Sequence, residues 1–385
     1  MTEVLEAGEQ GKMLKIIDKY ILRRFMGTFV FSIALMLAIF IVFDISEKLQ
    51  DFIAEKIPLN EIIFDHYLNF IPYYGNLFSP LFTFISVIFF TSKMAYKTEF
   101  VAILSSGTSF KRILRPYMIG AALITILSLV LNHFIIPKSN RIRIGFEDKY
   151  INNGYNTEEI NIHRQIAPNT VLYMGNYDNH TNTANHISIE KTARNKQLSM
   201  LKADNMKWDS IAKTWNLINV FERKIIYTVL DSVKPGMPKY VYKETHVFSP
   251  SKKLKIDFTP KDMVRFQSKI EVLPYFELKE FIQKEKLKGS SRIEFFEVEM
   301  YKRTAFPFAT FILTIIGVSI SSRKIRGGVG LHIALGLVLS CVYILFMHIS
   351  TTFATSGLAQ PLIAVWIPNF IFSFVAFYLY KKAQQ

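Results

Sequence analysis

The chain has 385 residues, half of them hydrophobic, and 46 Lys and Arg against 31 Asp and Glu give it a formal net charge of +15. This apolar and aromatic composition excludes a disordered chain, and the apolar residues gather in long runs. The one cysteine, Cys341, excludes a disulfide framework and a cysteine-based metal site.

An uncharged run over residues 25–43 predicts the first transmembrane helix. Residues 1–12 before it are polar, and four Lys and Arg follow between positions 15 and 24. A signal peptide is the alternative, but its apolar region would be shorter and would end in a small-residue cleavage site. The polar stretch DISEKLQDF follows instead. We therefore expect an uncleaved helix whose amino terminus lies in the cytoplasm.

Five further apolar runs predict membrane spans, and the second of the six is interrupted by Pro72 and Pro80. These runs cover about 66–91, 117–137, 301–322, 329–350 and 361–380. Six spans place both termini on the same side of the membrane.

The distribution of basic residues predicts the orientation. The segments assigned to the cytoplasm hold 15 Lys and Arg, whereas the short outer loops hold two. Because cytoplasmic loops of membrane proteins are enriched in basic residues, this asymmetry places both termini in the cytoplasm. It also accounts for the positive charge without nucleic acid, which we do not expect as a partner.

Residues 138–297 differ from the rest in that short alternating segments are separated by polar turns. This pattern is typical of an all-β sandwich or barrel. The predicted strands are 170–177, 186–192, 198–209 and 214–227, and a short helix is predicted over 272–288. Trp208 and Trp215 flank a predicted hairpin turn.

The segment KTEFVAILSSGTSFKRILRP, residues 97–116, lies between the second and third spans and carries five charged residues. Its apolar residues recur at helical spacing, so it predicts short amphipathic helices. Gly107 is expected to end the first, and Ser109 to cap the second by accepting a backbone N–H. Two interpretations remain open on physical grounds: a helix lying in the lipid headgroups, or a docking site for a cytoplasmic partner with Glu99 exposed.

Three stretches resemble the lipopolysaccharide-export permeases of the LptF/LptG type: DKYILRRF, the segment 97–116, and AVWIPNFIFSFVAFYLYKK near the end. The resemblance covers nearly the whole chain. It implies an α-helical integral membrane protein with six transmembrane helices and an inserted periplasmic all-β, jellyroll-like domain. The implied organisation is 1–137 with a coupling helix at about 97–108, the periplasmic domain at 138–297, and the last three spans at 298–385.

The resemblance implies a permease subunit of an ABC exporter in the bacterial inner membrane, which extracts lipopolysaccharide and passes it to a periplasmic bridge. The implied partners are a cytoplasmic ABC ATPase dimer, a second six-helix permease (a paralogue or the same chain), jellyroll bridge proteins and a single-span accessory subunit. ATP and Mg²⁺ would bind the ATPase, and no cofactor is expected in this chain, because SSGTSFKR lacks the pattern of a phosphate-binding loop. The implied ATPase contacts are Glu99, Phe100, Leu104, Ser106 and Gly107.

Basic residues near the outer ends of the spans are candidates for binding the phosphates of lipopolysaccharide. Arginine offers phosphate a bidentate fork and lysine a point charge. The candidates are Lys48, Lys56, Lys138, Arg141, Arg143 and Arg303, with Lys302 beside the last. The alternative is ordinary contact of long basic side chains with lipid headgroups.

Two features inside the spans have ordinary explanations. Gly328, Gly330 and Gly336 suit close helix packing, which the resemblance would assign to a lateral gate formed by the first and fifth spans. His133 and His348 are expected to be neutral and bonded to a neighbouring helix.

In the β domain, the alternating apolar residues predict either a lipid groove or a closed core, and both remain open.

Two other functions bear on the same sequence. A non-transporting membrane scaffold, whose β domain assembles envelope proteins, is compatible with the same architecture. A membrane enzyme is disfavoured, because the sequence contains no H-E-x-x-H, no G-x-S-x-G and no acidic pair within a predicted span.

Overall fold

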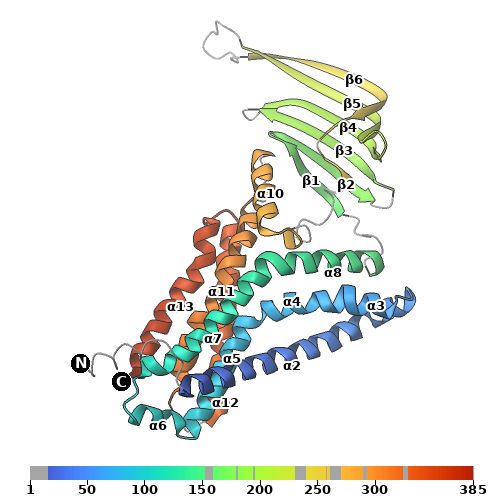
Figure 1. Ribbon diagram of the computed structural model, residues 1–385. Helices are drawn as coiled ribbons and strands as arrows, with labels where there is room; N and C mark the ends of the chain where they lie inside the picture. The colour runs from blue at the N-terminus through green and yellow to red at the C-terminus, as the bar shows by residue number, and fades with distance from the viewer. Residues whose placement is uncertain are drawn as a thin grey trace, which may run out of the picture. The chain divides into compact units, whose positions relative to one another are not determined.

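Residues 16–151, 159–178, 181–193, 196–229, 240–256, 258–260, 270–288, 293–323 and 328–384 are described by the computed structural model. The chain divides into two units (Figure 1). The helical unit comprises 1–50, 58–143 and 294–385, and the β unit comprises 51–57 and 144–293. The predicted insert, 138–297, begins and ends within a few residues of the segment 144–293 of the β unit.

The helices follow the apolar runs of the sequence. Those before the sheet are α2 (Ile16–Ala54), α3 (Leu59–Glu61), the π-helix η1 (Ile62–Tyr67), α4 (Leu68–Leu77), α5 (Ser79–Tyr96), α6 (Glu99–Ser105), α7 (Phe110–Val130), the π-helix η2 (Leu131–Ile135) and α8 (Ile136–Tyr150). Those after it are α11 (Ile293–Ser321), α12 (Gly328–Thr355) and α13 (Pro361–Gln384).

Among the described residues, five helices are long and apolar enough to cross a membrane, and a sixth candidate is a bent pair. The pair joins Leu59–Leu77 to Ser79–Tyr96 at an angle of 61°. Pro80 lies in the first turn after the bend, as proline prefers. Pro72 lies inside α4, so only one of the two prolines marks the interruption.

One of the span helices is longer than a bilayer is thick. The helix that starts at Phe110 runs on to Tyr150, which is 41 residues and about 60 Å at the α-helical rise. The hydrocarbon core is only about 30 Å thick. The third span was expected to end near residue 137, but the backbone stays helical to Tyr150 through mostly polar residues.

Glycines let α5 pack closely on α11 and α12. A Cβ atom added at Gly336 would lie 2.3 Å from Cδ1 of Ile88, and one at Gly317 would lie 2.9 Å from an α5 side chain. Gly330 instead faces open space, and the surroundings of Gly328 lie outside what the structure describes. Of the three glycines predicted to pack closely, Gly336 therefore contributes to a helix contact within the chain.

Hydrogen bonds between polar side chains also join helices of the helical unit. Buried Ser92 of α5 and His332 of α12 lie 2.9 Å apart, from Oγ to Nδ1. His133 of η2 lies 3.3 Å, through Nε2, from Oγ1 of Thr304 in α11. This contact agrees with the expectation for His133, whereas His348 is exposed. Hydrogen bonds of this kind satisfy polar groups that would otherwise face hydrocarbon.

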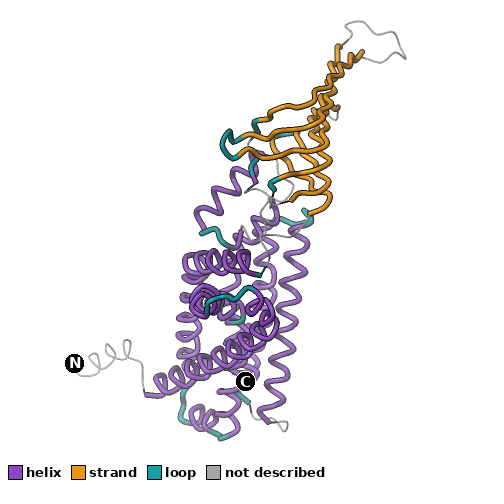
Figure 2. Tube along the Cα trace, turned by 90° about the vertical axis from the view of Figure 1, so that its right-hand side faces the viewer, coloured by secondary structure: helices purple, strands orange, loops and turns teal. Residues whose placement is uncertain are grey.

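The β unit holds one antiparallel sheet (Figure 2), and its strands follow chain order (Figure 1). The strands are β1 (Glu159–Ala167), β2 (Thr170–Asp178), β3 (Thr183–Ala193), β4 (Lys196–Asp209), β5 (Thr214–Val229) and β6 (Tyr240–Leu254), and α10 (Tyr275–Lys288) follows. The four predicted strands and the helix are confirmed, while β1 and β6 were not predicted. The described strands pair only with their chain neighbours, so the jellyroll order stays a prediction.

The core of the sheet is built around Trp215. Its side chain is fully buried, and its indole Nε1 donates a hydrogen bond to the carbonyl oxygen of Phe258 at 2.7 Å. Trp208 pairs with Trp215 across the predicted hairpin, with ring centroids 5.1 Å apart. In the turn, Asp209 accepts the backbone N–H groups of Ala212 and Ile211, each at 3.0 Å. These donors stabilise the carboxylate and hold the pKa of Asp209 below its usual value.

Candidate functional site

The segment between α5 and α7 is a short helix with a tight turn at each end. Thr98 before α6 has a φ of 61°, and Gly107 after it has a φ of 85°. The Ser109 side chain accepts the backbone N–H of Arg112 at 3.3 Å. The roles predicted for Gly107 and Ser109 are therefore confirmed. The helix, Glu99–Ser105, is shorter than the predicted 97–108.

Phe100 anchors α6 to the helical unit. Its side chain is fully buried and belongs to an apolar cluster with Phe25, Phe110 and Tyr117. The Phe100 and Phe110 ring centroids lie 6.2 Å apart. Phe100 was expected to contact a partner ATPase directly. A fully buried side chain has no surface to offer, so we assign Phe100 instead to holding α6 in place.

The other side of α6 is open to solvent. Val101 is 51% exposed and Leu104 is 37% exposed. Ser106 and Gly107 are also exposed, whereas Glu99 is partly buried and accepts a hydrogen bond from the Tyr20 hydroxyl at 3.3 Å. The predicted set therefore lies on or next to one short helix, with Val101 as an exposed neighbour that the sequence did not single out.

A buried ion pair joins the start of α2 to the start of α7. Arg112 contacts Asp18 through both guanidinium nitrogens, Nη1 to Oδ1 at 2.7 Å and Nη2 to Oδ2 at 2.5 Å. Asp18 is only 3% exposed. The sequence did not reveal this pair because the two residues lie 94 positions apart. Together with the Tyr20–Glu99 bond, it ties α2 to both ends of the α6 segment.

A polar cluster lies toward the other end of α2. Asp44 accepts a hydrogen bond from Tyr67 at 3.0 Å and contacts His66 at 2.8 Å. Lys48 pairs with Asp44 at 2.9 Å. Tyr67 and His66 belong to the π-helix η1, a rare conformation that recurs at functional sites. Lys48, a predicted phosphate ligand, therefore already has a carboxylate partner in this structure.

Two predicted cations converge on Tyr73 of α4. The Arg143 guanidinium carbon lies 5.6 Å from the centre of the Tyr73 ring. Arg303 and Lys302 line a pocket of about 80 Å³ with Tyr73 and Asn132. Arg143 and Arg303 are both buried. The Tyr73 ring therefore attracts the Arg143 guanidinium through a cation–π contact.

The remaining predicted cations do not gather there. Lys138 and Arg141 are exposed on α8, and Lys56 is exposed at the turn after α2, in the second unit. The structure thus separates two buried arginines, Arg143 on the Tyr73 ring and Arg303 in a pocket that Tyr73 also lines, from a set of exposed basic side chains.

An apolar cavity of about 260 Å³ lies at the bend between α4 and α5. Its walls come from the bend, α11 and α12, and include Phe78, Leu313, Tyr343 and Met347. Lys302 lines it as well as the Tyr73 pocket. The helical unit therefore places an apolar slot next to a basic group, which is the chemistry of a phosphorylated lipid.

The sheet carries a second apolar site, a groove of about 460 Å³. Ile166, Ile189 and Leu201 line the groove and also pack against the core around Trp215. The groove is thus continuous with the core of the sheet. Beside it, Arg223 pairs with Glu244 at 2.5 Å, and this guanidinium holds the Glu244 pKa below its usual value. Of the two interpretations left open, the structure contains elements of both: a packed core around Trp215 and an open groove that shares residues with it.

Within the described residues, no group of three or more His, Cys, Asp and Glu could hold a metal ion. The candidate functional features are the α6 segment and the basic residues near Tyr73 with their apolar slot in the helical unit, and, separately, the groove in the β unit.

Comparison with known proteins gives one family. The family described as lipopolysaccharide export system permease LptF/LptG matches residues 19–382. No curated protein matches the chain.

Proposed function

The chain belongs to the LptF/LptG family of lipopolysaccharide export permeases, and we propose that it is one permease half of an ATP-driven exporter. The exporter takes lipopolysaccharide from the outer leaflet of the inner membrane and passes it to a periplasmic bridge. The observation that supports this most directly is α6, a helix anchored by a buried phenylalanine and exposed on its other side.

In this proposal, α6 receives the force of a separate ATPase dimer that binds ATP and Mg²⁺. The exposed Val101 and Leu104 enter an apolar groove on the ATPase, and Ser106 and Gly107 allow close approach of the two backbones. Phe100 transmits the displacement to the cluster that it shares with α2 and α7. A tightly packed cluster moves as a unit because interiors deform little.

The cargo path starts at the Tyr73 cations. Arg143, Arg303 and Lys302 would hold phosphates, and the cavity at the α4–α5 bend would take part of an acyl chain. The groove of the sheet would receive the lipid next and pass it to a jellyroll bridge protein. A second six-helix permease and a single-span accessory subunit complete the exporter.

The orientation follows from the distribution of basic residues. The segments around α6 and both termini would lie in the cytoplasm, and the β unit in the periplasm. Lys48 contributes to cargo binding only if a phosphate competes with Asp44 for it.

Replacing Leu104 with arginine is expected to abolish binding of the ATPase. The arginine would bury a charge without a partner in an apolar contact. We expect this to weaken binding of the ATPase to the permease at least tenfold, or by more than about 1.4 kcal/mol. Co-purification of the ATPase with the tagged permease and ATP-dependent release of lipopolysaccharide should both fall. Ile211→Arg, at a fully exposed turn of the sheet, is the matched control and should change neither. Normal association of the Leu104→Arg variant would exclude α6 as the docking site.

Replacing both Arg143 and Arg303 with glutamine is expected to weaken lipopolysaccharide binding at least tenfold, because charge-assisted hydrogen bonds to phosphate are lost. Binding is measured with purified lipopolysaccharide and the detergent-solubilised permease. Arg141→Gln, on exposed α8, is the control and should have little effect. Thermal melting of each variant separates a binding defect from instability. An equal loss with Arg141→Gln would assign all these cations to nonspecific headgroup contact.

A further inference from the structure

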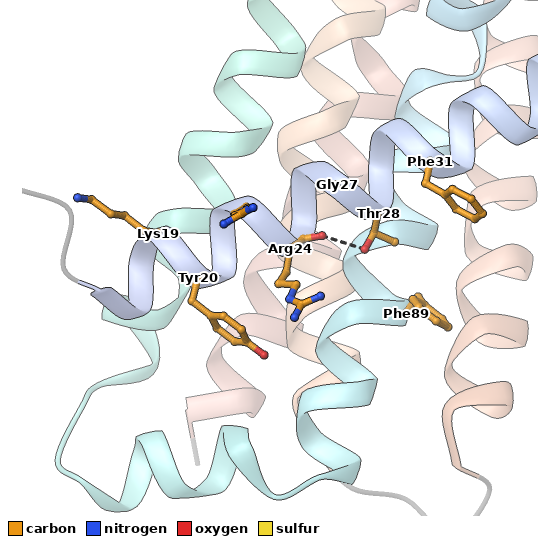
Figure 3. A pocket seen from close by; sticks show the side chains of 8 residues that line it. Lys19, Tyr20, Arg24, Gly27, Thr28, Phe31 and Phe89 are labelled. Carbon is orange, nitrogen blue, oxygen red and sulfur yellow. Dashed lines mark hydrogen bonds between the residues drawn. The ribbon is translucent and has the colours of Figure 1, made fainter.

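A groove along the amino-terminal part of α2 lies apart from the proposed cargo path. Its volume is about 780 Å³, and it is lined by residues of α2 together with Phe89 of α5. Figure 3 shows Tyr20 and Arg24 projecting from one stretch of α2, with Phe31 and Phe89 further along. The groove therefore has a polar end and an aromatic end.

The polar end carries three cations, Lys19, Arg23 and Arg24, all exposed. None of them has a carboxylate partner in the described part of the chain. Arg24 lies over the Tyr20 ring, with its guanidinium carbon 5.8 Å from the ring centre. Glu99 is bonded to the Tyr20 hydroxyl and does not line the groove. Three positive charges on adjacent turns of one helix, at a membrane surface, attract an anionic headgroup.

The other end of the groove is apolar and has room for a ligand. Phe31 is 69% exposed and Phe89 is 40% exposed. Between them and the cations, Gly27 leaves space, because a Cβ atom added there would meet nothing within 4 Å. From Arg24 to Phe31 the helix rises about 10 Å, which is enough for the first part of an acyl chain.

We propose that this groove binds an anionic glycerophospholipid. The phosphate lies among Lys19, Arg23 and Arg24, and one acyl chain lies over Gly27 toward Phe31. The groove is at the same end of α2 as the α6 segment, which the basic residues assign to the cytoplasmic leaflet. The cations proposed for the cargo lie elsewhere, on α8 and α11. The lipid would therefore be a membrane phospholipid and would lie beside Tyr20, which holds Glu99.

Native mass spectrometry of the purified full chain in detergent tests this proposal. Delipidated protein is titrated separately with phosphatidylglycerol, phosphatidylcholine and lipid A. Phosphatidylglycerol should bind at least tenfold more tightly than phosphatidylcholine. Gly27→Leu fills the groove and should reduce phosphatidylglycerol binding to the level of phosphatidylcholine. The double variant Lys19→Gln, Arg23→Gln should weaken it about 30-fold and remove the headgroup preference.

Gly330→Leu is the matched control, since Gly330 also faces open space on an apolar helix. It should bind phosphatidylglycerol as the natural chain does. Equal binding of phosphatidylglycerol and phosphatidylcholine, or undiminished binding by Gly27→Leu, would overturn the proposal. Tighter binding of lipid A would place the groove on the cargo path and overturn it as well. Dissociation of a permease dimer by Gly27→Leu, with lipid binding unchanged, would show that a second chain covers the groove.

Discussion

Replacing Asp18 with alanine is expected to loosen the contact between α2 and α7 and to separate ATP hydrolysis from transport. Breaking a buried ion pair leaves a charge without its partner and costs about 3–5 kcal/mol. The Arg112 side chain is 28% exposed, so water compensates part of this, and we expect a loss of about 2 kcal/mol. Thermal unfolding of the purified permease measures the change.

The functional effect follows from where the pair lies. Asp18 holds the start of α2 against the start of α7, which directly follows the α6 segment. Without it, motion of α6 should reach α2 less completely. Lipopolysaccharide released per ATP hydrolysed should therefore fall severalfold while the ATPase still co-purifies.

The exposed Arg115 on the same helix provides the control, and Arg115→Ala should leave stability and transport unchanged. The double variant Asp18→Ala, Arg112→Ala should lose less stability than the sum of the two single changes. Strict additivity would mean that the two side chains act independently and do not brace α2 against α7 as a pair.

Replacing Trp215 with alanine is expected to destabilise the sheet by about 3–5 kcal/mol, the range found when a large buried aromatic side chain is removed. The indole fills the centre of the core and donates its N–H to Phe258. Its loss also leaves the carbonyl of Phe258 without that donor. Hydrogen exchange of the amides in β2–β5 of the full chain should accelerate by more than about a hundredfold.

Ile211→Ala is the control for this experiment, because that side chain is 97% exposed in the hairpin turn beside Trp215. It should leave exchange unchanged. Since the groove of the sheet shares Ile166, Ile189 and Leu201 with the core, Trp215→Ala should also reduce lipid transfer. Unchanged exchange in β2–β5 would show that Trp215 does not hold the sheet together.

The predictions from sequence succeeded where the relevant interactions are local. Long uncharged apolar runs located the apolar helices, and alternation located four strands. The left-handed conformation of Gly107 and the capping by Ser109 were predicted because both depend on a few adjacent residues. Elements at the ends of the predicted segments were missed. Strands β1 and β6, at the two ends of the sheet, were not predicted, and α8 continues past residue 137 through mostly polar residues.

The burial of individual side chains and their pairing with distant residues could not be predicted from the sequence. Leu104 and Phe100 belong to one amphipathic helix, yet one is exposed and the other fully buried. The sequence shows two apolar residues at helical spacing without saying which side meets the protein. Likewise, six basic residues were equivalent candidates until the structure placed Arg143 on the Tyr73 ring, Arg303 in the neighbouring pocket and Lys48 beside Asp44.

The sequence by itself determined the long apolar helices, the inserted β unit and the family, because hydropathy, alternation and short motifs are properties of neighbouring residues. Only the tertiary structure decided that α6 is held by Phe100, that Asp18 braces Arg112 and that Gly27 opens a groove. Those features depend on contacts between segments far apart in the chain, and such contacts exist only once the apolar faces have packed together.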